Sequence, residues 1–278
     1  MIKSILVPVD GSDNSRVAID YAIYFAQLFN AELCGLNVVD VRSLEGPFLS
    51  DISASLGFAP FQNYLPKFQE ILEERSDLIL NNVEQKVISS QIKFRKKRLS
   101  GVVSTLISEE AKMFDMVVIA QRGEHAQWSS GLLGSTTESV VRKIPRPVLV
   151  TTNTFRKIKN ITVAYDGEFE SSNALKTALE MFIDDAFNVN VVIVTDDIEK
   201  KEKLTSEVSE FVTPYNKDVN ITVLSGDSGK AIIDYVEDNS SDIIVMGVFS
   251  HSRIHDIILG STAAYILRKA SIPVLLNR

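Results

Sequence analysis

Short apolar runs alternate along the chain with longer stretches in which apolar residues recur every three or four positions. The run "SILVPVDGS" (residues 4–12) is apolar until it ends at Asp10, Gly11 and Ser12, which predicts a buried strand and a turn. Residues 12–30 place their apolar side chains on one stripe, as an amphipathic helix does. That stripe consists of Val17, Tyr21, Phe25 and Leu28.

The same alternation continues to the end of the chain. In the first half, further strands are expected at 32–41, 91–101, 115–123 and 146–151, with helices over 68–87, 102–113 and 135–143. In the second half, strands are expected at 160–168, 189–197, 220–228, 242–250 and 272–278, with helices between them, the first starting at Ser172. Strands that alternate with helices predict parallel sheets covered by helices on both faces. The fold class is therefore α/β, with two doubly wound five-stranded parallel-sheet domains.

An internal repeat supports the division into two domains. "GSTTESVVRKIPRPVL" (134–149) returns as "GSTAAYILRKASIPVL" (260–275), 126 residues later, which is a domain-sized period. We assign residues 1–152 to the first domain and 158–278 to the second. The polar residues 151–157 lack periodicity and serve as the linker. Much of the size difference between the copies comes from the loop-rich residues 42–66.

Composition and charge exclude several protein classes. The formal net charge of −7 argues against a nucleic-acid binder. The basic run Lys93–Arg98 is better explained as a charged edge strand that resists pairing with other sheets. One cysteine, no signal-peptide pattern and no long uncharged apolar run favour a soluble, cytoplasmic protein without membrane contact.

Two loops in each half are expected to meet at the ligand-binding edge. Ligands of open parallel sheets bind beyond the carboxyl ends of the strands. Asp10 and Asp166 follow the first strand of each half, and "GST" opens a helix at Gly134, Ser135 and Thr136 and again at Gly260, Ser261 and Thr262. Such helix starts bind anions through free N–H groups. The alternative is simple capping, since Ser135 and Glu138 form a capping-box pattern.

These loops resemble those of the universal stress proteins, once in each half. In that family the loop reads Gly, two residues, Gly, nine residues, Gly and Ser or Thr, and it wraps the phosphates of ATP. The second half has Gly247, then Ser250 in place of the next glycine, and keeps the nine-residue spacing to Gly260. The first half has Ala120 for the first glycine, then Gly123, and ten residues before Gly134. We therefore expect unequal sites, the second half being the better nucleotide binder.

The resemblance also implies the remaining site residues and the assembly. Asp10 and Asp166 would face the ribose and adenine, Pro8 and Val38 would line the base pocket of the first half, and Val194 that of the second, where Ala164 replaces the proline. The fold would be adenine nucleotide alpha-hydrolase-like. Residues 146–151 and 272–278 would pair as an internal pseudo-dimer, with a further homodimer left open.

Three classes of function remain. The first is an ATP-responsive binding module, with Mg²⁺ as an open addition, whose occupancy is read by an unknown protein partner. The second is a stress adaptor with a closed or repurposed pocket. A slow ATPase ranks last, since no Walker lysine or general base is evident and no catalytic residue is assigned. "GDSGK" (226–230) fails as a P-loop, and His251 and His255 lack the context of a metal site. Trp128 and Phe249 would either cover a base or block the pocket.

Overall fold

The structure is a computed structural model, and it describes residues 2–40, 65–124, 133–248 and 259–278. The first half contains β1 (Ser4–Pro8), α1 (Asp13–Phe29), β2 (Glu32–Asp40), α4 (Leu65–Ile88), β3 (Phe94–Gly101), α5 (Val103–Ala111), β4 (Met116–Ala120), α6 (Ser135–Lys143) and β5 (Val148–Thr151). The second half contains β6 (Asn160–Tyr165), α7 (Phe169–Met181), β7 (Asn188–Val194), α8 (Ile198–Val212), η3 (Thr213–Tyr215), β8 (Val219–Leu224), α9 (Ser228–Asp238), β9 (Ile243–Gly247), α10 (Ser261–Lys269) and β10 (Val274–Asn277). Every predicted strand is present, and the first helix of the second half starts at Phe169 rather than Ser172.

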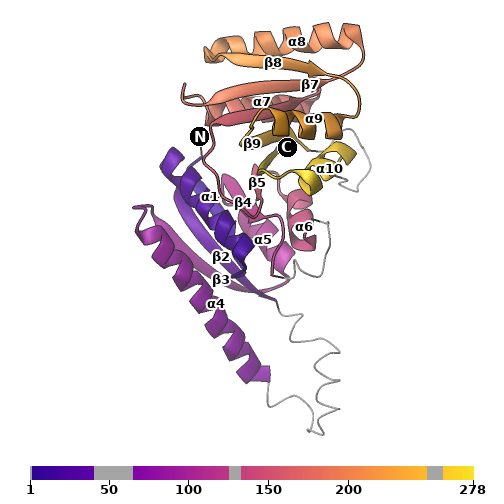
Figure 1. Cartoon of the computed structure of the whole chain (residues 1–278). Coiled ribbons are helices and arrows are strands. Elements are labelled where there is room, and N and C mark those ends of the chain that lie inside the picture. Colours follow the sequence, from indigo (N-terminus) through magenta and orange to yellow (C-terminus); the bar gives the residue numbers. More distant parts are fainter. Residues whose placement is uncertain (1, 41–64, 125–132, 249–258) are drawn as a thin grey trace.

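The strands form one ten-stranded sheet in the order β3-β2-β1-β4-β5-β10-β9-β6-β7-β8. Within each half all strand pairs are parallel. The halves join where β5 and β10 pair antiparallel, with Leu149 opposite Leu275. The order is the same from either end, so the two predicted five-stranded sheets form the predicted internal pseudo-dimer (Figure 1).

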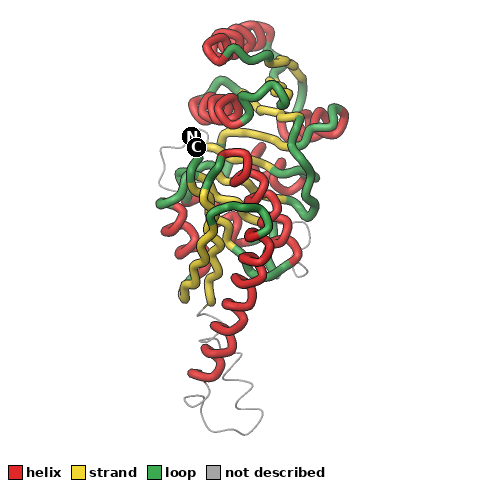
Figure 2. Tube along the Cα trace, turned by 90° about the vertical axis from the view of Figure 1, so that its left-hand side faces the viewer, coloured by secondary structure: helices red, strands yellow, loops and turns green. Residues whose placement is uncertain are grey.

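Helices cover both faces of the sheet, as the alternation predicts. On one face, α1, α4, α7 and α8 pack on residues such as Val7, Leu149 and Val163. On the other face, α5, α6, α9 and α10 pack on residues such as Leu6, Val150 and Leu276. Figures 1 and 2 show α4 running past the end of the sheet. None of the described helices is long and apolar enough to span a membrane.

The basic run lies on the edge strand β3, as predicted. Four of its five cations, all of them on β3, have a carboxylate partner. These ion pairs are Arg95–Glu32 at 2.9 Å, Lys96–Glu84 at 2.8 Å, Lys97–Glu110 at 2.7 Å and Arg98–Asp77 at 2.7 Å. These four cations are therefore paired within their own domain, as suits a charged edge strand.

Candidate functional site: a pocket at the strand ends of the second half

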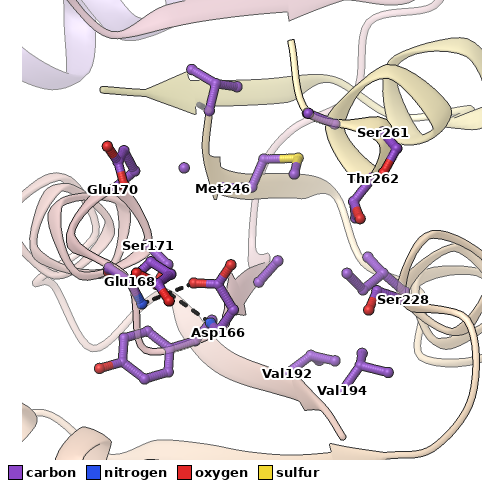
Figure 3. Close-up of a pocket in the computed structure, with 17 residues that line it drawn as sticks. Asp166, Glu168, Glu170, Ser171, Val192, Val194, Ser228, Met246, Ser261 and Thr262 are labelled. Atoms are coloured by element: carbon purple, nitrogen blue, oxygen red, sulfur yellow. Dashed lines mark hydrogen bonds between the residues drawn. The ribbon is translucent and has the colours of Figure 1, made fainter. Parts of the chain in front are cut away.

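The carboxyl ends of β6, β7 and β9 and the starts of α7, α9 and α10 surround a cavity of about 160 Å³. The predicted residues Asp166, Val194, Gly247, Gly260, Ser261 and Thr262 all line it, together with Ala164. Figure 3 shows Asp166 between the start of α7 and the strand ends, with Ser261 and Thr262 on the far side. Ser250 lies outside the described residues, as do Trp128, Phe249, His251 and His255.

Asp166 is held by the turn that begins α7. Gly167, at φ +88°, reverses the chain after β6. The Asp166 carboxylate accepts a hydrogen bond from the Glu168 N–H at 3.0 Å, and the Asp166 N–H donates to Ser171 Oγ at 3.4 Å. These are the contacts drawn as dashed lines in Figure 3. A positive φ favours glycine here, which explains the Asp-Gly pair after the first strand of each half.

The helix α10 presents its N-terminus to the pocket. Gly260 is its N-cap, with φ −55°, and no side chain caps the first turn. A Cβ added at Gly260 would have no described neighbour within 4 Å. The first N–H groups of a helix lack intrahelical partners and carry a partial positive charge. This side of the pocket can therefore bind an anionic group.

Gly247 is required for a different reason from the one the sequence suggests. Its φ is not positive, so a left-handed backbone does not explain the glycine. A Cβ at Gly247 would lie 2.5 Å from the carbonyl carbon of Glu170 and 2.7 Å from the Ser171 nitrogen. The first turn of α7 occupies that space, so Gly247 permits helix packing at the floor of the pocket. The equivalent Ala120 lies inside β4 and is buried, so its Cβ is accommodated there.

The remaining lining residues carry carboxylates, apolar side chains and hydroxyls. Sequence reasoning missed Glu168 and Glu170, which bring two more carboxylates to the lining. It also missed the apolar wall of Val192, Ile232 and Met246, and the hydroxyl of Ser228. Burial raises the pKa of the Tyr165 phenol, whose hydroxyl donates to Glu207 at 3.5 Å. Ser228 lies in the "GDSGK" segment, where the helix α9 begins. That helix start was the sequence signal that could have identified Ser228.

The first-half residues are close together but bond to one another. The Asp10 carboxylate accepts from the Ser12 N–H at 3.0 Å, the Ser12 hydroxyl at 2.6 Å and the Glu124 N–H at 2.7 Å. A Cβ at Gly123 would be 2.6 Å from Asp10 Oδ2. Gly134 donates to the Gln121 carbonyl at 3.0 Å, so the loop after β4 contacts the start of α6. Asp10 is thereby engaged by its own half.

The other first-half candidates occupy the predicted elements. Pro8 ends β1 opposite Leu36, and Val38 lies in β2 opposite Leu99. Ser135 and Thr136 open α6. The capping-box expectation is wrong, because Gly134 is the N-cap and Ser135 is already helical, with no side-chain cap bond. Glu138 instead pairs with Arg142 at 2.7 Å, one helical turn later.

Comparison with known proteins decides the family. A sequence model of the universal stress protein family matches residues 1–152 and 194–278. The chain belongs to the universal stress protein family. The stretch between the two matches contains β6, α7 and most of β7, which supply Asp166, Glu168 and Glu170.

Relatives of this universal stress protein match either its full length or about half of it. A universal stress protein of Synechocystis is 28% identical over the full length of both chains. One from Methanocaldococcus jannaschii is 32% identical over 54% of this chain and 82% of its own. The crystal structure of a universal stress protein from Archaeoglobus fulgidus superposes with a TM-score of 0.78 at 22% identity, covering 99% of this chain and 98% of the other. That similarity establishes the shared fold.

Proposed function

We propose that this universal stress protein is a cytoplasmic, ATP-responsive binding module whose nucleotide site lies in the second half. Occupancy of that site would change a surface that a protein partner reads. The observation that carries the proposal is the convergence of Asp166, Val194, Gly260, Ser261 and Thr262, from three separate segments, on one cavity. The sequence alone, through the strand ends, the helix start and the family resemblance, assigns each of them to the ligand site.

The lining fits the three chemical parts of an adenine nucleotide. The uncapped start of α10 and the hydroxyls of Ser261 and Thr262 suit phosphate oxygens. The Asp166 carboxylate suits ribose hydroxyls, and the apolar wall near Val194 suits a base. Pockets that enclose drug-sized ligands span roughly 300–1,000 Å³. The cavity of about 160 Å³ would therefore enclose only part of ATP.

The acidic lining constrains how a phosphate chain would lie. Asp166, Glu168 and Glu170 all border the cavity, and like charges repel strongly in a partly buried site. The phosphates would therefore lie on the α10 side. Within the described residues no group of three or more potential ligands could hold a metal ion. A Mg²⁺ ion would accordingly arrive with the phosphates rather than occupy a protein site of its own.

The same carboxylates favour the alternative function. Among the described lining residues there is no lysine, arginine or histidine to neutralise a phosphate. A stress adaptor whose pocket takes a small ligand without phosphates would suit that charge. Adenosine and ATP therefore distinguish the two functions, because only the binding module requires the phosphates for affinity.

A matched pair of substitutions tests the proposal. Ser261 and Ser135 are both exposed first residues of nine-residue helices, and acidic residues stabilise helix starts. Ser261→Asp should weaken ATP binding at least tenfold in calorimetry, because its carboxylate would stand at the phosphate position. Ser135→Asp should bind ATP like the wild type. Equal affinities for ATP in both folded variants would refute the second-half site, and tighter binding of adenosine than of ATP would favour the adaptor.

A further inference from the structure

The wall of the pocket beside β7 is apolar apart from one hydroxyl. Val192, Val194, Ile232 and Met246 supply its apolar surface. Ser228, the half-buried first residue of α9, supplies the hydroxyl. Figure 3 shows Ser228 beside Val194, across the pocket from Ser171 and Glu168. A single polar side chain on an apolar wall is the kind of group that fixes ligand orientation.

The order of the strands indicates which part of a nucleotide would meet this wall. The helix α10 follows β9, Asp166 follows β6, and β7 lies beyond β6 in the sheet. Phosphates at α10 and ribose at Asp166 therefore direct the base over β7. The helix α9 contacts both β7 and α10, so its first residue faces the base end. This step rests on the proposed nucleotide site.

The start of α9 positions the Ser228 hydroxyl, and that hydroxyl takes no part in capping the helix. Asp227 caps the helix, its carboxylate accepting from the Lys230 N–H at 2.9 Å. The Ser228 hydroxyl has no hydrogen-bond partner among the described residues, so it is available to a ligand. A Cβ at Gly229 would lie 2.8 Å from the Tyr265 ring, so this glycine lets α9 pack closely on α10. That packing fixes Ser228 relative to the phosphate end.

The first half has an apolar residue at the equivalent place. Its helix α5 begins at Val103, two residues after Gly101, as α9 begins at Ser228, two residues after Gly226. Ile107 and Ile232 follow at the same spacing and are both buried. We propose that Ser228 is a specificity-determining residue of the second-half site, whose hydroxyl accepts a hydrogen bond from the exocyclic amino group of adenine.

Two probes and two variants of the full chain test this. ATP and purine riboside triphosphate differ in that amino group and share their phosphates and ribose. The wild type should favour ATP by about 3- to 10-fold, the worth of one hydrogen bond. Ser228→Val, which copies the first half, should reduce that ratio to about 1 while keeping the affinity for purine riboside triphosphate within about twofold. Ser228→Thr, which retains the hydroxyl, should keep the preference for ATP.

The ratio of the affinities for ATP and purine riboside triphosphate distinguishes lost recognition of the amino group from damage to the structure. A distorted helix α9 would weaken both ligands together and leave their ratio unchanged. An unchanged ratio in Ser228→Val, or a wild type that binds both ligands equally, overturns the role of Ser228 and leaves the nucleotide site standing. A wild type that binds neither ligand overturns the nucleotide site and, with it, the role of Ser228.

Discussion

Asp10 and Asp166 follow the first strand of their halves at equivalent places, yet their carboxylates have different partners. Asp10 accepts three hydrogen bonds, two of them from Ser12. At the position of Ser12 the second half has Glu168, and within the described residues Asp166 accepts only the Glu168 N–H bond. One carboxylate holds its own half together, while the other lines a cavity.

The difference lies in a few side chains on one shared backbone plan. Both halves have the same strand order, the same Asp-Gly turn with positive φ, and the same glycine N-cap on the last helix. Ala120 and Gly247, and Val103 and Ser228, are among the pairs that differ near the strand ends. A fused pair of domains can therefore keep its sheet and its junction while one site changes.

Gly247→Ala gives the largest expected effect on stability. Its Cβ would meet the backbone of Glu170 at 2.5 Å, where nothing flexible can give way. We expect a loss of about 3 kcal/mol in the free energy of unfolding, measured by urea denaturation. Gly260→Ala, with no described neighbour within 4 Å of its Cβ, is the control and should change stability little. Equal losses in the two variants would contradict the assigned role of Gly247.

Asp10→Ala should cost more stability than Asp166→Ala. The first removes the acceptor of three hydrogen bonds and leaves the Glu124 N–H without its partner, at a cost of about 2 kcal/mol. The second removes one described bond and should cost half as much or less. Chemical denaturation of both variants measures the difference. A greater loss in Asp166→Ala would reverse the comparison between the halves.

Asp115 should contribute more to stability than Asp242, because it accepts one more hydrogen bond. Asp115 accepts from the Lys3 and Ser4 N–H groups at 2.8 and 3.0 Å and from the Ser4 hydroxyl at 3.1 Å, whereas Asp242 accepts from the Lys159 and Asn160 N–H groups at 2.9 and 2.8 Å. Asp115→Ala should cost about 2 kcal/mol at pH 7 and Asp242→Ala about 1.5 kcal/mol, measured by chemical denaturation. A greater loss in Asp242→Ala would contradict this comparison.

The contribution of Asp115 should depend on pH. Burial acts to raise the pKa of its carboxyl, but the hydrogen bonds from Lys3 and Ser4 outweigh it, so the pKa lies below the usual value. Because this pKa is lowered in the folded state, the ionised carboxyl stabilises the fold at pH values above its unfolded pKa of about 3.9. That stabilisation is lost as the pH falls below this value and through the lower pKa of the folded state. The stability gap between wild type and Asp115→Ala should therefore narrow from pH 7 to pH 3. A gap that widens would contradict this.

Gln121→Ala gives the smallest effect and tests a contact between the halves. The Gln121 side-chain amide donates to the carbonyl of Leu267, in the last turn of α10. Helix-end carbonyls lack intrahelical partners, so the loss should be about 1 kcal/mol. At the corresponding place the second half has Val248, which carries no donor. Thermal denaturation measures the loss, and an unchanged melting temperature in Gln121→Ala would contradict the account.

The repeat and the periodicity predicted the fold, whereas tertiary contacts decided the details of the site. Buried strands are visible as apolar runs because burial on both faces requires them. The capping of α6 was not visible, since it depends on the backbone angles of Gly134 rather than on residue type. The role of Gly247 was hidden because close approach by a helix and by a phosphate both require glycine. Ser228 lies in the "GDSGK" segment, which fails as a P-loop, and the packing of α9 on α10 brings it to the pocket.

The stoichiometry of ATP binding to the intact chain tests the central claim, that only the second half binds nucleotide. Isothermal titration calorimetry should give one ATP per chain. Asp166→Ala should lower the affinity for ATP by roughly 10- to 100-fold, the range for a hydrogen bond to a charged group. Asp10→Ala should keep one site with unchanged affinity. Two ATP molecules per chain, or binding lost in Asp10→Ala and kept in Asp166→Ala, would contradict the account.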